Sequence, residues 1–225
     1  MTALLETVEH ETGPQPQWSV LWLHGLGADG NDFAPIVPEL VRRDWPSIRF
    51  VFPHAPVRAV TINGGARMRA WYDIRDMNLA NRADGEGVAE SVAQVEALIA
   101  REGERGIAAD RVLLAGFSQG GAITLAAGIA RANPLAGLIA LSTYLPMAPA
   151  QAEAALRPQA NSQPLFMAHG VFDPVVPVAA GEASAKAMRA FGFDVQWHRY
   201  PMQHAVCPEE ILHLGDWMTA RFAAG

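Results

Sequence analysis

Three residue types that cooperate in acyl transfer occur in one order along the chain: a serine, an aspartate and a histidine. Ser118 is the centre of Gly116-Phe117-Ser118-Gln119-Gly120, a G-x-S-x-G pentapeptide. A serine hydroxyl is a poor nucleophile until a base removes its proton, and histidine is the usual base because its pKa lies near the working pH. We therefore expect Ser118 as nucleophile, His204 as base and Asp173 as the acid that orients the base.

The pentapeptide lies between a strand predicted at 112–115 and a helix predicted at 122–132. A tight strand-to-helix turn strains the backbone of its central residue, and glycine on either side removes Cβ atoms that would clash. The backbone N–H that follows Ser118 then faces the same space as the hydroxyl, near the positive end of the helix dipole. The same residues would suit a glycine-rich turn of any α/β protein, and the flanking strand and helix favour the nucleophile turn.

Competing assignments exist for each of these residues. Cys207, the one cysteine, lies three residues after His204, but no such turn presents it, and a lone cysteine is more often a small buried apolar residue. Asp173 precedes a proline and could simply form an Asx-type turn. His24 and His169 each precede a glycine and could brace the backbone.

Predicted strands alternate with predicted helices, which indicates a mainly parallel sheet with helices on both faces. Ligands bind such sheets beyond the carboxyl ends of the strands, where the segments containing residues 24–30, 118, 173 and 204 all lie. The strands are expected at 4–8, 18–23, 48–52, 112–115, 137–141, 165–168 and 195–200. The helices are expected at 32–43 (capped by Asp32), 87–104, 122–132, 151–156, 179–191 and 208–222.

The loop after the strand at 18–23 contains Gly25-x-Gly27-x-x-Gly30, formally a dinucleotide-binding pattern. That reading needs an acidic residue at the end of the next strand, about 20 positions on, and Asp44 precedes that strand. The helix also starts after the glycines rather than among them. The alternative is an oxyanion loop, in which the glycines let backbone N–H groups face a substrate.

A long excursion, predicted as a loop, spans residues 54–83 near the expected site. Loops of this length in compact domains are usually functional, and Met68, Trp71, Tyr72 and Leu79 could form an apolar substrate wall. Trp71 and Tyr72 could equally pack the loop against the core. The residues predicted to contact substrate are Met68, Trp71, Leu145, Phe172 and Met202.

Composition excludes several classes of function. The 225 residues suit one α/β domain spanning 1–225. The net charge of −6 without a basic run argues against nucleic acid or an anionic membrane as partner. The N-terminus is acidic and does not resemble a secretory signal, and apolar runs fall short of the roughly 18 residues that a membrane span needs. Neither a metal-binding spacing nor a Walker A pattern is present, so we expect no metal.

Six segments together resemble the bacterial carboxylesterase and acyl-protein thioesterase (phospholipase/carboxylesterase) branch of the α/β-hydrolases. The resemblance implies an α/β-hydrolase fold, a Ser118–His204–Asp173 triad and an oxyanion hole formed by the backbone N–H groups of Leu26 and Gln119. It also implies a cofactor-free, cytoplasmic or peripheral protein that is commonly dimeric. The segments are HGLGADGND (24–32), PHAPVRAVTINGG (53–65), MRAWYDI (68–74), GFSQGGA (116–122), FDPVVP (172–177) and MQHAVCPEE (202–210).

The first functional hypothesis is a serine carboxylesterase that hydrolyses short- to medium-chain acyl esters through an acyl-enzyme. The alternative is an acyl-protein thioesterase or a lysophospholipase. A third hypothesis, from another class, is a non-catalytic acyl-binding module that keeps the fold, although fold alone would not require the three residues together.

Overall fold

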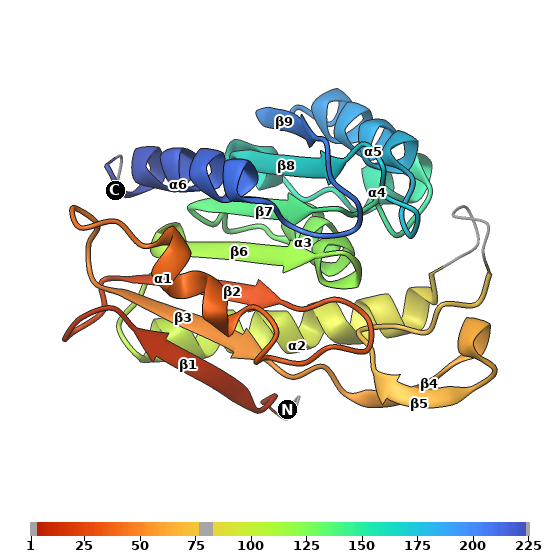
Figure 1. Cartoon of the computed structure of the whole chain (residues 1–225), viewed down its shortest axis with the longest axis horizontal. Coiled ribbons are helices and arrows are strands. Elements are labelled where there is room, and N and C mark those ends of the chain that lie inside the picture. The colour runs from red at the N-terminus through yellow and green to blue at the C-terminus, as the bar shows by residue number, and fades with distance from the viewer. Residues whose placement is uncertain (1–3, 77–82, 224–225) are drawn as a thin grey trace.

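Seven strands form one sheet in the computed structural model, which describes residues 4–76 and 83–223 (Figure 1). The spatial order is β1-β3-β2-β6-β7-β8-β9, and every neighbouring pair is parallel except β1 with β3. The mainly parallel sheet predicted from the sequence is therefore confirmed. The strands are β1 (Thr7–Glu11), β2 (Trp18–Leu23), β3 (Ile48–Pro53), β6 (Val112–Phe117), β7 (Gly137–Leu141), β8 (Leu165–Gly170) and β9 (Val195–Tyr200).

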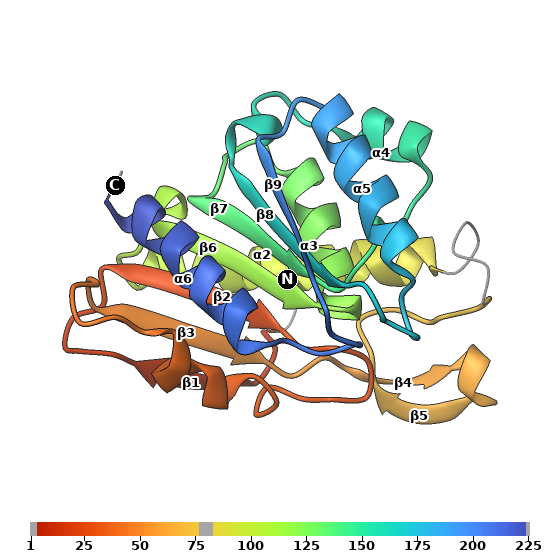
Figure 2. The ribbon, with the colours of Figure 1, turned by 45° about the horizontal axis from the view of Figure 1, so that its top comes forward.

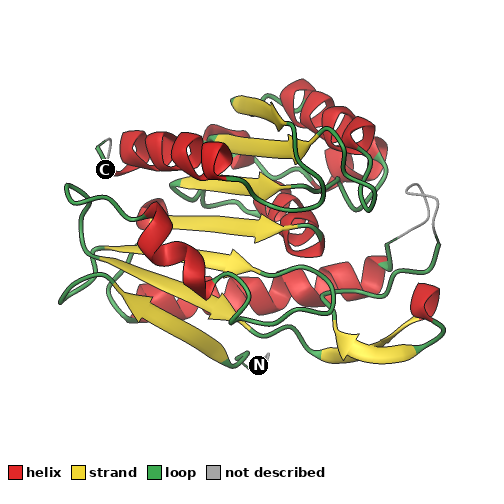
Figure 3. Cartoon of the chain, in the orientation of Figure 1, coloured by secondary structure: helices red, strands yellow, loops and turns green. Residues whose placement is uncertain are grey.

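Helices cover both faces of this sheet, also as predicted (Figure 3). The 3-10 turn η1 and the helices α1 and α6 pack on one face, and α2, α3, α4 and α5 pack on the other. The helices are η1 (Ala34–Ile36), α1 (Val37–Leu40), α2 (Gly85–Glu104), α3 (Gln119–Ala130), α4 (Pro149–Ala155), α5 (Val178–Ala190) and α6 (Pro208–Phe222), and short 3-10 turns occur at η2 (Thr61–Asn63), η4 (Ala109–Arg111) and η5 (Ala160–Ser162).

The alternation of side chains along the strands explains the two apolar layers. In β2, Val20 and Trp22 point to the layer under α1 and α6, whereas Leu21 and Leu23 point to the layer under α2 and α3. All four side chains are fully buried. Because both layers share the strands of one sheet, we propose that the chain unfolds as a single domain.

The helix predicted at 32–43 is much shorter in the structure. Only η1 and α1 form there, the side chain of Asp32 caps neither, and the backbone becomes extended at Val41. Pro35 and Pro38 explain the difference, because neither has a backbone N–H and each restricts the turn before it. The segment therefore stays as two linked turns beside the mouth of the site.

The prediction of a loop throughout 54–83 is also wrong. The strands β4 (Val57–Val60) and β5 (Ala66–Arg69) form an antiparallel hairpin, seen at the lower right of Figure 1. Gly64 and Gly65 at its tip both have positive φ, 65° and 78°, which glycine adopts without steric cost. Leu79, expected in the apolar wall, lies outside the described residues. Within the described part, none of the helices has the length and apolar character needed to cross a bilayer.

Candidate active site

The candidate catalytic residues lie at the carboxyl edge of the sheet, where parallel strands end together (Figure 2). Ser118 follows β6, Asp173 follows β8, and His204 lies in the loop after β9. The loop 24–30 follows β2, which pairs with β6. The four segments singled out in the sequence are therefore brought to one edge.

Ser118 occupies a strained turn between β6 and α3. Its backbone has φ 54° and ψ −117°, in a region that L-residues rarely adopt and that costs about 1–3 kcal/mol. A Cβ at Gly116 would collide with the backbone of Gly120, and one at Gly120 would collide with the backbone of Leu23. The turn is held by the Thr143 hydroxyl, which donates to the Ser118 carbonyl at 2.6 Å. The two glycines are thus required by packing, as the motif predicts.

A continuous chain of hydrogen bonds joins the three side chains. The Nδ1 of His204 lies 2.6 Å from Asp173 Oδ2, and its Nε2 lies 2.8 Å from Ser118 Oγ. An ionised carboxylate can only accept, so Nδ1 carries the proton and Nε2 is free to accept the serine proton. The ring of Phe117 packs against the imidazole, with centroids 4.7 Å apart. This is the arrangement that a general base needs to activate a serine.

Asp173 is fixed by a second set of bonds. Its Oδ1 accepts the backbone N–H groups of Val175 and Val176, each at 2.8 Å, and its side chain is fully buried. The Asx-type turn considered as an alternative is therefore present, and it orients the carboxylate toward His204. His169 approaches the same oxygen as His204, with Nε2 at 3.5 Å from Oδ2, and donates to the Val176 carbonyl at 2.8 Å. Burial lowers the pKa of His169, which favours its neutral form.

The backbone N–H groups of Leu26 and Gln119, predicted as oxyanion donors, have no hydrogen-bond partner among residues 4–76 and 83–223. The neighbouring Gly27 has φ 78° and donates to the Arg69 carbonyl at 2.9 Å, which ties the loop to the end of β5. A Cβ at Gly30 would collide with the Phe52 carbonyl, so packing against β3 accounts for this glycine. The first helical turn after these glycines is η1, which begins at Ala34, so the helix that a pyrophosphate site needs does not start among them. The oxyanion role of the loop stays a prediction.

His24 braces this loop, as the sequence suggested. Its Nδ1 donates to the Gly25 carbonyl at 2.7 Å, and its Nε2 accepts the Ala55 N–H at 3.0 Å. Burial lowers the pKa of His24 to about 4, so the ring is neutral near pH 7. His24 therefore serves the backbone and not the chemistry.

Trp71 does not line the substrate space, and this prediction is wrong. Its side chain is fully buried, and its indole N–H donates to the His24 carbonyl at 2.9 Å. Tyr72 is equally buried, with its hydroxyl 2.8 Å from that of Tyr144. A large amphipathic aromatic in a loop can anchor that loop by its polar atom as readily as it can face a ligand. The packing alternative holds for both residues.

The other predicted contact residues lie around the site. Met68 is half-buried beside Gly27, and Leu145 lines an apolar cavity of about 310 Å³ with Tyr144, Met147 and Ala183. Phe172 is 65% exposed, next to Asp173 in sequence, and donates its N–H to the carbonyl of half-buried Met202 at 3.1 Å.

Sequence reasoning missed the role of the Gln119 side chain. Its Oε1 accepts the Trp71 N–H and its Nε2 donates to the Tyr72 carbonyl, both at 2.8 Å. The excursion is thereby tied to the residue that follows the nucleophile. No spacing in the sequence links positions 71 and 119, so this contact could not have been found there.

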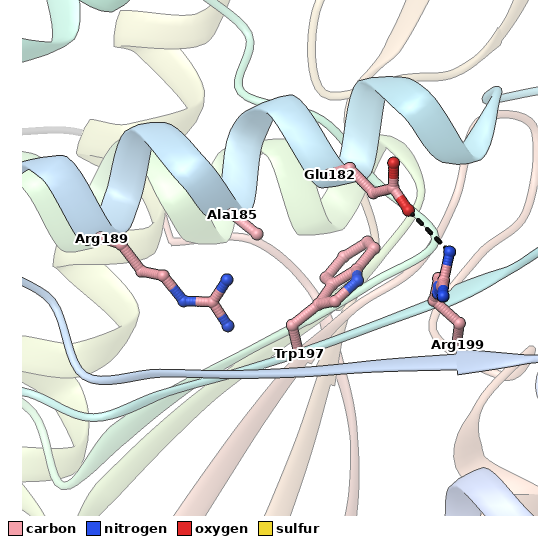
Figure 4. Close-up of a pocket in the computed structure, with 5 residues that line it drawn as sticks. All are labelled: Glu182, Ala185, Arg189, Trp197 and Arg199. Carbon is pink, nitrogen blue, oxygen red and sulfur yellow. Dashed lines mark hydrogen bonds and ion pairs between the residues drawn. The ribbon is translucent and has the colours of Figure 1, made fainter.

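A different cavity lies far along the sheet, between α5 and the edge strand β9 (Figure 4). The side chain of Trp197 lies between two arginines, and both arginines are already paired. Arg199 bonds Glu182 at 3.0 Å and Arg189 donates to the Val195 carbonyl at 3.0 Å. This cavity has no nucleophile, and the candidate site remains the one at Ser118.

A mainly parallel sheet, covered on both faces and presenting a serine on a strained turn after β6, defines an α/β-hydrolase fold. The chain belongs to the Phospholipase/Carboxylesterase family, whose model matches residues 5–220. It is 38% identical over 211 residues to acyl-protein thioesterase 1 of Neurospora crassa, covering 90% of this chain and 86% of the relative.

Solved structures of plant proteins share the fold. The crystal structure of Arabidopsis thaliana SOBER1 has a TM-score of 0.86 at 30% identity, covering 91% of this chain and 98% of that protein. Acyl-protein thioesterase 2 of Zea mays has a TM-score of 0.82 at 28% identity, covering 96% and 99%. The resemblance noted in the sequence is confirmed at the level of the family, and these relatives are fungal and plant proteins rather than the bacterial ones expected.

Proposed function

We propose that this protein is a serine hydrolase that cleaves short- to medium-chain carboxylic acyl esters or thioesters through a covalent acyl-enzyme. The observation that carries the proposal is the hydrogen-bond chain from Ser118 through His204 to Asp173. The oxyanion donors would be the backbone N–H groups of Leu26 and Gln119. No cofactor or metal is needed for this chemistry.

The mechanism follows from the directions of the hydrogen bonds. Ser118 Oγ attacks the acyl carbonyl as His204 Nε2 accepts its proton, and the two backbone N–H groups stabilise the oxyanion. His204 then protonates the leaving oxygen or sulfur as its bond to the acyl carbon breaks. Water, activated by the same imidazole, releases the acid and restores the serine.

The acyl group would occupy the apolar cavity lined by Leu145. This cavity begins at Tyr144, directly after Thr143, whose hydroxyl bonds the Ser118 carbonyl. It lies under α5, on the same face of the sheet as α3. The exposed side chain of Phe172 and the half-buried Met68 and Met202 would border its approach.

A fluorophosphonate labelling experiment tests the proposal. Intact-mass measurement should show one adduct on the wild-type chain and none on Ser118→Ala, with both proteins folded by circular dichroism. An unlabelled, folded wild type would instead favour a non-catalytic acyl-binding module.

Of the two bonds proposed as substrate, the thioester is favoured by similarity to proteins named acyl-protein thioesterase 1. Matched substrates, S-octanoyl and O-octanoyl derivatives of one leaving group, separate the two activities by kcat/KM. We further expect a cytoplasmic homodimer, as the family resemblance implies, and sedimentation analysis tests the oligomeric state.

A further inference from the structure

A second cavity lies on the opposite face of the sheet from the proposed acyl cavity. It has a volume of about 440 Å³ and opens between the segment 32–39 and the start of α6. Glu39 of α1 and Ile211 of α6 contribute to its lining. These two helices lie on the face of the sheet opposite α3 (Figure 1). The acyl cavity begins beside Thr143 and the second cavity is lined by His204, and both of these residues are hydrogen-bonded to Ser118. The two cavities thus approach the nucleophile from opposite faces of the sheet, as the two halves of an ester or thioester would require.

His204 itself lines this second cavity. In the proposed mechanism, the proton on Nε2 must pass to the leaving atom, so the leaving group has to lie against the imidazole. The floor of the cavity is an aromatic series, in which Phe33 lies 5.3 Å from Phe117 and Phe117 lies 4.7 Å from His204, measured between ring centroids. Val206 adds to the apolar surface.

The carboxylates that line this cavity give it a negative charge. Asp32 and Glu39 both line it, and no Lys or Arg side chain does. Neither carboxylate belongs to an ion pair formed within the described residues. Both side chains are exposed to solvent. Partial desolvation and the nearby charge of Asp29 raise the pKa of Asp32, and a bound cation would lower it again. Aromatic faces beside carboxylates also suit a cation.

We propose that this cavity is the leaving-group subsite and that it selects leaving groups with a positive charge close to the scissile bond, such as a cysteine flanked by basic residues. The proposal rests on the proposed function, because it assigns His204 to the leaving atom. Asp32 and Glu39 supply the charge preference, and Phe33 and Phe117 contact the stem of the leaving group.

The test uses three peptides that carry the same S-octanoyl cysteine between two lysines, two glutamines or two glutamates. We expect kcat/KM to fall in that order, by about three- to tenfold between the lysine and glutamate peptides, because each partly exposed ion pair contributes modestly. The difference should shrink in about 0.5 M NaCl, which screens exposed charges. Asp32→Asn with Glu39→Gln should bring the three rates together.

Glu153→Gln is the matched control, because it removes an exposed carboxylate on α4 that lies outside the cavity. This variant should keep the wild-type order of rates. Small thioesters form a second arm: butyrylthiocholine should be cleaved faster than S-butyryl 3-mercaptopropionate, and equal rates would count against a subsite that selects positive charge.

Equal rates for the three peptides, or an order that survives the double variant, would overturn the inference while leaving the hydrolase intact. The same holds if the chain takes the fluorophosphonate adduct yet cleaves none of the peptides. Loss of both the adduct and all hydrolysis would instead contradict the proposed function.

Discussion

The backbone N–H of Trp71 donates to the side-chain carbonyl of Gln119, 2.8 Å away. Gln119 directly follows the proposed nucleophile, and its own backbone N–H is a proposed oxyanion donor. The indole of Trp71 bonds the His24 carbonyl, at the start of the loop that carries Leu26. One buried tryptophan therefore connects the two segments that would hold the oxyanion.

Removing this link should reduce turnover as well as stability. We expect Gln119→Ala to lower the free energy of unfolding by about 1–3 kcal/mol, since two buried backbone groups lose their partners. It should also lower kcat about tenfold, because a small displacement of oxyanion donors weakens transition-state binding. Urea titration and steady-state kinetics measure the two effects.

Gln163 offers a matched control for that experiment. It is also buried, accepts the Leu135 N–H at 3.1 Å and donates to the Gly128 carbonyl at 2.8 Å, away from the site. Gln163→Ala should cost similar stability with kcat little changed. Equal kinetic losses in the two variants would count against a positioning role for Gln119.

Asp173→Asn should remove the negative charge beside His204 while keeping the side chain in its place. The asparagine oxygen can still accept from Val175 and Val176, but its amide would face His204 Nδ1 and favour the wrong tautomer. By analogy with the same change in other triads, we expect kcat to fall roughly 10³- to 10⁴-fold with little change in melting temperature. Asp194→Asn, at an exposed position outside the site, should retain full activity.

Gly120→Ala should prevent the turn at Ser118 from closing, because the new Cβ would overlap the Leu23 carbonyl. Overpacking against backbone costs about 1–3 kcal/mol or more, so we expect a lower melting temperature together with lost fluorophosphonate labelling. Gly103→Ala in α2 has open space around its Cβ and should raise stability by about 0.5–1 kcal/mol. A tolerated Gly120→Ala with full labelling would refute this account of the turn.

The buried carboxyl of Glu210 should make the free energy of unfolding depend on pH. Burial raises the pKa of this carboxyl, in the first turn of α6, to about 8. In the unfolded chain this carboxyl ionises near its ordinary pKa of 4.5, whereas in the folded chain it keeps the proton. The contribution of Glu210 to stability therefore declines as pH rises from 4.5 towards 8. Glu210→Gln should therefore gain stability relative to wild type across that window, whereas exposed Glu209→Gln should follow the wild-type curve in urea titrations.

Local signals were sufficient for much of the fold. The bounds of β2, β7 and β9 match the prediction. Each is a short run of residues with high strand propensity, and residues typical of turns follow it. Ser118, Asp173 and His204 could be selected because each follows a strand end. Their catalytic roles stay predictions until labelling and mutagenesis test them.

Other features depend on contacts that spacing does not encode. The hairpin of β4 and β5 follows from pairing between two short segments, and Trp71 turns inward because the His24 carbonyl is available as its acceptor. Pro38, in the first turn of α1, interrupts the helix predicted at 32–43, and the expected Asp32 cap does not form. The cavity beside His204 needs η1 and α6 to meet, a relationship between the two ends of the chain.

The proposed nucleophile and its base are 86 residues apart in sequence, although their atoms are 2.8 Å apart in space. During synthesis on a ribosome, Ser118 would emerge well before His204 and would have no base to accept its proton. The nascent chain would therefore not react with acyl groups in the cell until β9 had joined the sheet. Reactivity of the serine would then report that the whole sheet is complete, which makes a fluorophosphonate a probe of folding as well as of catalysis.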